Sequence, residues 1–141
     1  MRHRHFGILV TTAVGLWLAA VTTTVDAFGQ AAAAAKTTKG RVYTAAQATR
    51  GEALYMGLCV SCHPPATYTG AVFLTWQGRS LGELLDFLQE KMPKNDPGSL
   101  TAKEYADVMA YLLRLNKMPT GRVDLPADGK LLRAITIDIL P

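Results

Sequence analysis

The feature that most limits what this chain can fold into is one five-residue segment, Cys59 to His63, with the sequence Cys-Val-Ser-Cys-His. The 141-residue chain has two cysteines, both in this segment, and three histidines, of which the other two are His3 and His5. Those two histidines precede an expected cleavage site. Any thiol or imidazole chemistry of the processed chain is therefore confined to a single turn of backbone.

The N-terminus is typical of a secretory signal peptide. Arg2 and Arg4 form a basic start, Phe6 to Val21 is an uncharged apolar run of 16 residues, and Val25–Ala27 is a small-x-small cleavage site. We expect a signal peptide over residues 1–27 and export to the periplasm. An uncleaved membrane anchor is the alternative, but the run is shorter than the roughly 20 residues that a membrane helix needs. No stable membrane span is therefore expected after cleavage.

Charge excludes one class of partner. The formal net charge of +4 falls to +3 when two arginines and one aspartate leave with the signal peptide. The remaining basic residues are scattered along the chain rather than gathered in one stripe, so nucleic acid is not an expected partner.

The processed chain is predicted to be all-α. Residues 28–42, with their alanine run, have too little apolar variety to pack and are expected to form a flexible leader. The main domain is expected over residues 43–121, followed by an extension at 122–141 that wraps it, with a possible strand near 134–137. Three helices are predicted from capping boxes, in which a Ser or Thr side chain and a residue three positions later bond each other's backbone. These boxes are Thr44 with Gln47, Ser80 with Glu83, and Thr101 with Glu104.

Three short helices joined by long loops bury little apolar surface. A helix of a dozen residues is marginally stable alone, so a large apolar group is expected between these helices. The segment from Cys59 to His63 suggests which group. Thiols three residues apart on a helical turn can add to the two vinyl groups of haem, and the next residue, His63, then points its imidazole at the iron. One covalently attached haem c is the predicted cofactor, and the three main helices are expected to pack around it.

Other uses of the segment fit less well. A zinc site needs about four ligands, and the processed chain offers no further cysteine or histidine. A thioredoxin-like redox pair would need a βαβ pattern, which is absent. A structural disulfide between Cys59 and Cys62 suits an oxidising compartment, but it would leave His63 and the small core unexplained.

A second axial ligand for the iron is expected to be methionine, because no other histidine remains. Met56 lies on the helix that enters the motif, and Met109 lies in the apolar stripe of the third helix. Met92 and Met118 remain, each followed by proline. We favour Met92, because it ends the second helix and opens a loop rich in turn-forming residues that can hold a side chain over the haem.

Four motifs in order carry a resemblance to a known family. They are Cys59 to His63, Trp76-Gln77-Gly78, Met92-Pro93 with Pro97 to Leu100, and Tyr105 to Leu112. From about Tyr43 to Gly121 the chain resembles a class I, monohaem cytochrome c of the bacterial periplasmic type. The resemblance implies the cytochrome c fold, with His63 and Met92 as axial ligands. It also implies that Gly51 and Tyr55 pack against Val108 and Tyr111 where the terminal helices cross.

Two points near the haem stay open. Trp76 is a candidate to bond a haem propionate through its indole N–H, and a half-buried core aromatic is the equal alternative. Family members commonly place a proline some residues after the histidine, whose carbonyl accepts the ring N–H of the ligand. Here Pro64 and Pro65 follow His63 at once, so the acceptor for His63 is not identified.

The expected function is single-electron transfer rather than catalysis, because iron with two protein ligands excludes substrate. Expected partners are a donor dehydrogenase and a terminal acceptor in a periplasmic or respiratory chain, with the protein as a monomer. The alternative is a haem c subunit dedicated to a periplasmic dehydrogenase, which would have the same chemistry as a free carrier but a different partner. An open-site, gas-binding haem protein is less consistent, because such four-helix cytochromes carry the motif near the C-terminus.

Overall fold

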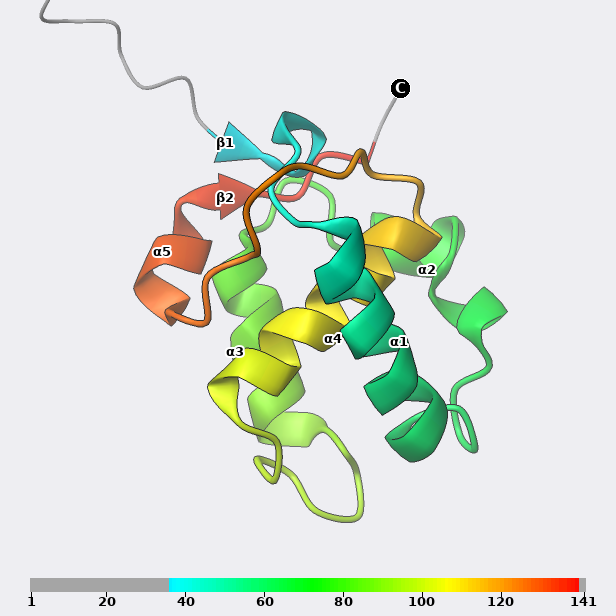
Figure 1. Ribbon diagram of the computed structural model, residues 1–141. Coiled ribbons are helices and arrows are strands. Elements are labelled where there is room, and N and C mark those ends of the chain that lie inside the picture. Colours follow the sequence, from blue (N-terminus) through cyan, green and yellow to red (C-terminus); the bar gives the residue numbers. More distant parts are fainter. Residues whose placement is uncertain (1–35, 140–141) are drawn as a thin grey trace, which may run out of the picture. The chain divides into compact units, whose positions relative to one another are not determined.

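The computed structural model describes residues 36–139 and is mostly helical, so the expected all-α fold is confirmed. The predicted signal peptide and residues 28–35 lie outside the described residues. Figure 1 labels the α-helices and strands. In chain order the elements are β1 (Lys36–Thr37), the 3-10 helix η1 (Thr38–Gly40), α1 (Ala45–Leu58), the 3-10 helix η2 (Pro65–Tyr68), α2 (Ala71–Leu74), α3 (Leu81–Lys91), α4 (Ala102–Leu115), α5 (Gly129–Arg133) and β2 (Ile135–Thr136).

The three long helices begin where the sequence predicts. The Ser80 and Glu83 pair closes a full capping box at α3, and Thr101 with Glu104 does the same at α4. At α1 the box is only half formed. Thr44 accepts a hydrogen bond from the Gln47 backbone at 3.0 Å, but the Gln47 side chain turns to another partner. The prediction of a capping box at α1 is therefore wrong for its second half.

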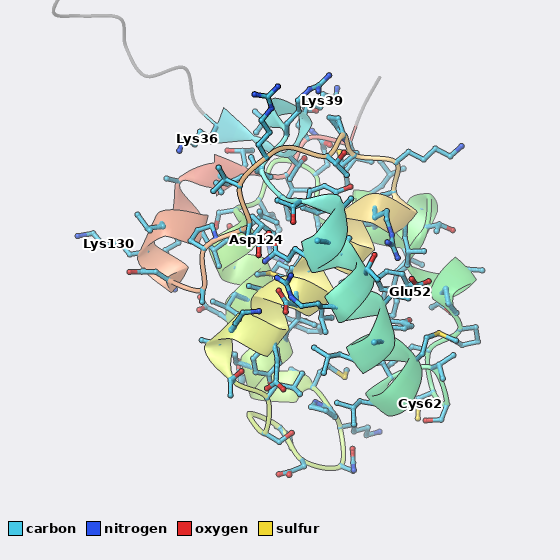
Figure 2. The ribbon with its side chains drawn as sticks, in the orientation of Figure 1. Lys36, Lys39, Glu52, Cys62, Asp124 and Lys130 are labelled. Atoms are coloured by element: carbon cyan, nitrogen blue, oxygen red, sulfur yellow. The ribbon has the colours of Figure 1, made fainter. Side chains whose placement is uncertain are left out.

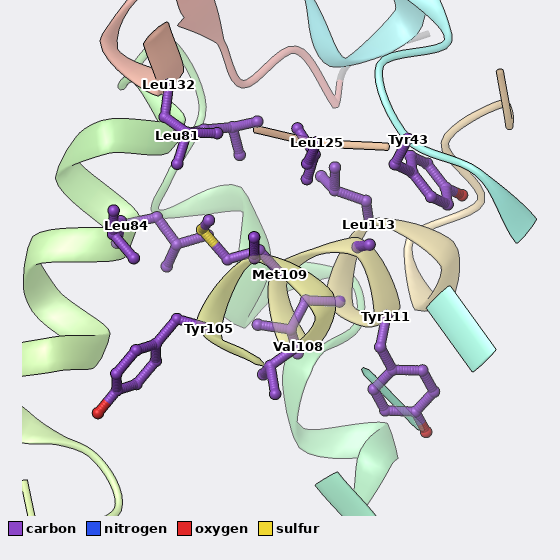
Figure 3. Close-up of a cluster of buried hydrophobic side chains, with 14 of the residues drawn as sticks. Tyr43, Leu81, Leu84, Tyr105, Val108, Met109, Tyr111, Leu113, Leu125 and Leu132 are labelled. Carbon is purple, nitrogen blue, oxygen red and sulfur yellow. The ribbon is translucent and has the colours of Figure 1, made fainter. Parts of the chain in front are cut away.

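Helix α4 is the centre of the core. Every residue from Tyr105 to Leu113 is buried, so this helix is covered on all sides. Figure 3 shows side chains of α3, the tail and the region before α1 gathered around it. Helix α1 crosses α4 at Gly51, where a Cβ atom would collide with the backbone carbonyl of Asp107 and press on the nitrogen of Val108. The rings of Tyr55 and Tyr111 lie 5.1 Å apart at the same crossing, which confirms the predicted contact.

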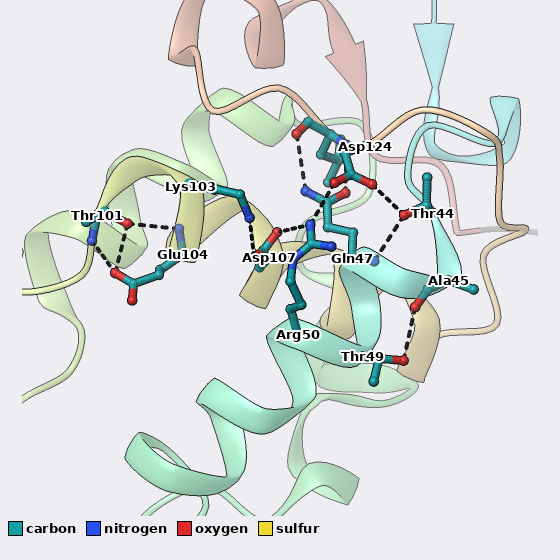
Figure 4. A network of polar contacts seen from close by, with 11 residues as sticks. Thr44, Ala45, Gln47, Thr49, Arg50, Thr101, Lys103, Glu104, Asp107 and Asp124 are labelled. Atoms are coloured by element: carbon teal, nitrogen blue, oxygen red, sulfur yellow. Dashed lines mark hydrogen bonds and ion pairs between the residues drawn. The ribbon is translucent and has the colours of Figure 1, made fainter.

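A buried carboxylate joins the two crossing helices. Asp107 of α4 accepts two hydrogen bonds from Arg50 of α1, both at 3.0 Å, and a third from Lys103 (Figure 4). Its side chain is 4% exposed. Burial acts to raise the pKa of Asp107, but the bonds from Arg50 and Lys103 outweigh it and hold the pKa below its usual range. Asp107 is therefore expected to be ionised in the folded protein.

Replacing Asp107 with asparagine should give a pH-dependent loss of stability. The folded pKa of Asp107 is below its unfolded value of about 4, so the ionised carboxylate stabilises the fold above that value and ceases to do so as the pH falls through the folded pKa. We expect Asp107→Asn to lower the free energy of unfolding by about 1–3 kcal/mol at neutral pH, with the difference shrinking in acid. Chemical denaturation over a pH series measures it. Glu90→Gln, which breaks an exposed pair with Lys91, is the control and should change little. A loss of equal size at every pH would contradict the assignment.

Residues 36–42, expected to belong to a flexible leader, are an ordered part of the fold. Strand β1 pairs in parallel with β2, and Thr38 is fully buried. The Thr38 hydroxyl donates to the carbonyl of Asp138 at 3.1 Å and accepts from its backbone N–H at 2.9 Å. The structure corrects the expectation for these seven residues, because their packing partner lies about 100 positions away, beyond the reach of a local composition rule.

The C-terminal residues are fastened to the helices at several points. The buried amide of Gln47 donates to the carbonyl of Leu125 at 3.2 Å and accepts from its N–H at 2.7 Å. Further along, Ile137 is fully buried and exchanges backbone bonds with Gly78 and Arg79. Figure 1 shows this segment passing the start of α1 and placing α5 beside α3. Within residues 36–139 no helix is long and apolar enough to cross a membrane.

Candidate functional site

A cavity of about 650 Å³ lies against the segment that contains both cysteines. Folded interiors hold few voids larger than a water molecule, whereas pockets for cofactors measure roughly 300–1,000 Å³. The walls come from the end of α1, the following turn, α2, α3, the loop after α3, and α4. Their main apolar residues are Tyr55, Leu58, Tyr68, Phe73, Trp76, Leu84, Phe87, Leu88, Val108 and Leu112. The cavity therefore has the size and lining expected for one large, apolar group.

Both thiols face this cavity. Cys59 caps the C-terminus of α1, and its carbonyl accepts hydrogen bonds from the backbone N–H groups of Cys62 at 3.2 Å and His63 at 2.9 Å. This tight turn brings the two cysteines and the histidine to the same wall, and Figure 2 shows Cys62 just beyond the end of α1. The thiols are free, and burial raises the pKa of Cys59.

Two tyrosines hold His63. The Tyr55 hydroxyl donates to the backbone carbonyl of His63 at 2.5 Å, and the Tyr68 hydroxyl lies 2.9 Å from the ring nitrogen Nδ1. Within residues 36–139, the other ring nitrogen, Nε2, makes no hydrogen bond. Burial raises the pKa of Tyr68, and it raises that of Tyr55 further. The sequence does not identify the partner of the His63 ring, and the structure places Tyr68 there.

Met92 lines the cavity together with Cys59, Cys62 and His63. It is the C-cap of α3, and its carbonyl accepts a hydrogen bond from the Tyr105 hydroxyl at 2.7 Å. The same hydroxyl accepts from the backbone N–H of Gly98 at 3.1 Å, so one side chain ties together the two ends of the loop after α3. The sequence indicates Tyr105 only as the start of the last motif, and it gives no sign of this anchoring contact.

The other methionines of the described residues do not line the cavity. Met109 is fully buried in the core, Met118 is buried with its carbonyl accepting a hydrogen bond from the Tyr43 hydroxyl, and Met56 is half exposed on α1. Among the methionines of residues 36–139, Met92 is therefore the one that shares a cavity with His63.

Trp76 also lines the cavity, between α2 and α3. Its ring meets Phe87 edge-on with centroids 5.5 Å apart, and the Arg79 guanidinium lies 4.3 Å above it. Arg79 also bonds Glu83 at 3.1 Å, so its charge is paired on the surface. In the described part of the chain, the indole N–H of Trp76 donates to no protein group.

Residues 36–139 contain no group of three or more His, Cys, Asp or Glu side chains placed to hold a metal ion. The donors present are two thiols, one imidazole and one thioether, around an apolar cavity.

Residues 46–112 match the model of the family described as cytochrome C oxidase, cbb3-type, subunit III. No curated protein and no solved structure matches the chain. The matched segment runs from the first turn of α1 into α4 and contains every residue that lines the cavity.

Proposed function

We propose that residues 46–112, which match the family described as cytochrome C oxidase, cbb3-type, subunit III, form a cytochrome c domain that binds one haem c. The chain would then be a monohaem electron carrier with His63 and Met92 as axial ligands. One observation carries the proposal. A single apolar cavity is lined by Cys59, Cys62 and His63 from one turn and by Met92 from a different loop.

The residues at the wall after α1 fit covalent attachment. Cys59 and Cys62 are free thiols on one tight turn, at the spacing needed to reach the two vinyl groups of one haem. Through its Nε2 atom, His63 would be the axial ligand on that side. Haem bound in this cavity would supply a one-electron couple of its iron.

Met92 is proposed as the ligand from the opposite side. Its backbone is fixed by Leu88, whose carbonyl accepts the Met92 N–H at 2.8 Å, and by Tyr105. A thioether ligand opposite imidazole raises the reduction potential and fills the last coordination position. With that position filled, the chain's residues serve to bind and shield the cofactor rather than to accept substrate. This is the reason for proposing a carrier rather than an enzyme.

Trp76 is proposed to contact the haem as well. Its indole N–H is available at the cavity wall, and a propionate is an acceptor that would suit it. The Arg79 guanidinium stacked on its ring would add favourable charge near such an acceptor.

Replacing Met92 tests the axial assignment. Met92→Leu keeps the volume of the side chain but removes the sulfur, so the domain should still fold and attach haem. We expect the oxidised protein to lose the weak far-red absorption that accompanies a methionine sulfur bound to haem iron, to become high-spin, and to bind carbon monoxide when reduced. Visible spectroscopy measures all three.

Met118→Leu makes the same change at a buried methionine away from the cavity. It should leave the spectrum unchanged. A wild-type protein that is already high-spin and binds carbon monoxide would favour the gas-binding alternative instead.

Export and partners are part of the proposal. A signal peptide over residues 1–27 would deliver the chain to the periplasm, where haem c is attached in bacteria. A donor dehydrogenase and a terminal acceptor are the proposed partners, and a dedicated dehydrogenase subunit is the alternative. Pull-down from periplasm with the intact holoprotein would separate the two, because a dedicated subunit should co-purify in fixed proportion with one large partner.

A further inference from the structure

The turn after His63 folds back onto the histidine ring. Pro65 begins the 3-10 helix η2, which ends at Tyr68, five residues beyond His63. The rings of Tyr68 and His63 have centroids 5.2 Å apart, and the Tyr68 hydroxyl lies 2.9 Å from the His63 ring nitrogen Nδ1. The position usually held by a proline carbonyl in this family is thus taken by a phenol.

Tyr68 is itself held from two other elements. Asn116, the C-cap of α4, donates through its side-chain amide to the backbone carbonyl of Tyr68 at 2.8 Å. The ring of Tyr55 meets that of Tyr68 edge-on, with centroids 6.5 Å apart. Contacts from α1 and from the C-cap of α4 therefore position the phenol.

Coordination decides which atom donates in the contact. If Nε2 of His63 binds iron, a neutral imidazole must carry its proton on Nδ1, so Nδ1–H donates and the Tyr68 oxygen accepts. A neutral phenol oxygen is a weaker acceptor than a peptide carbonyl. It therefore draws less on the Nδ1 proton and leaves the imidazole a poorer electron donor to the iron.

We propose that Tyr68 is a positioning residue that accepts the Nδ1–H of His63, fixes the plane of the ring, and holds the reduction potential of the haem above the value that a carbonyl acceptor would give. This proposal rests on the proposed function, since it requires His63 to be an iron ligand. A hydrogen bond to the ligand stabilises the oxidised iron more than the reduced iron, because the oxidised iron draws more on the donor electrons of the imidazole.

Tyr68→Phe tests the proposal, because it keeps the ring and removes only the acceptor. Oxidised iron then loses more stabilisation than reduced iron, so the potential should rise. At a fixed applied potential, we expect the ratio of oxidised to reduced protein to fall threefold to tenfold. A tenfold change corresponds to about 59 mV for one electron. A redox titration of the holoprotein measures this shift.

Tyr111→Phe is the matched control. Tyr111 is buried against Tyr55, does not line the cavity and makes no contact with His63. The same loss of a hydroxyl there should leave the potential unchanged. Equal potentials in the two variants would overturn the proposal.

A measurement on the native protein decides the matter even if Tyr68→Phe does not fold. In the NMR spectrum of the reduced holoprotein, the His63 Nδ1–H signal should exchange slowly with solvent and show a cross-relaxation peak to the Tyr68 ring. An Nδ1–H without that peak overturns the proposal. Wild-type protein with no covalent haem, or with a high-spin spectrum, would instead refute the proposed function. A His/Met spectrum without the contact refutes only the role of Tyr68.

Discussion

Replacing Cys59 and Cys62 together with serine is expected to abolish covalent haem attachment. Serine keeps the size of each side chain, but its hydroxyl does not form the thioether bond. Protein expressed with the cytochrome maturation machinery should therefore lose its visible absorption after denaturation and extraction, whereas the wild type keeps it. The same double replacement should also cause a large loss of helix, measured in the far-ultraviolet circular dichroism spectrum.

The size of the cavity is the reason for expecting partial unfolding. Without its cofactor, the chain would leave an apolar cavity of about 650 Å³ to water, and the walls from α1, α3 and α4 would lose the apolar surface that the cofactor buries. The chain without its cofactor should therefore collapse around the cavity or unfold.

Ser61→Ala is the control, because it keeps both thiols and removes only the Ser61 hydroxyl, which donates to Cys62 Sγ at 3.9 Å. It should keep covalent haem and a native spectrum. Covalent haem in the double-serine variant would contradict the proposed attachment.

The second large effect is expected at Gly51. A methyl group there would collide with the backbone of α4 at Asp107, and backbone cannot move aside as a flexible side chain can. We expect Gly51→Ala to destabilise the holoprotein by about 1–3 kcal/mol or more, because α1 must shift along α4. Since α1 leads into Cys59, the shift should also disturb the cavity wall. Thermal unfolding of the holoprotein measures the loss, because the unfolding midpoint should fall by about 4–8 °C for each kcal/mol.

Gly40→Ala makes the same change where a Cβ atom would meet only Val42, at an ordinary 4.0 Å. Its effect on the midpoint of unfolding should be small. Equal midpoints for the two variants would show that the crossing at Gly51 is not close-packed in solution.

Local signals predicted the helices well. The boxes at Ser80 and Thr101 each lie within one turn of backbone, so three residues suffice to recognise them. The same reasoning was wrong for the second half of the box at Thr44. The Gln47 amide bonds Leu125 instead, 78 positions away, and nothing near Gln47 in the sequence indicates that competition.

The candidate site was likewise predictable from the sequence only where its residues are contiguous. Contiguous residues define the turn at Cys59 to His63, so its chemistry could be inferred from the sequence alone. Tyr68 and Tyr105 escaped notice because their importance depends on where their hydroxyls reach, not on any periodic pattern. The order of residues 36–42 was missed because these residues pair with the other end of the chain.

The intact mass of the denatured protein tests the central claim most directly. The full chain should be expressed together with the cytochrome maturation machinery and its mass recorded after unfolding has released any group that is not covalently bound. The account predicts the mass of the processed chain plus one haem. The mass of the chain alone, or of the chain less two hydrogens for a bond between Cys59 and Cys62, would contradict it.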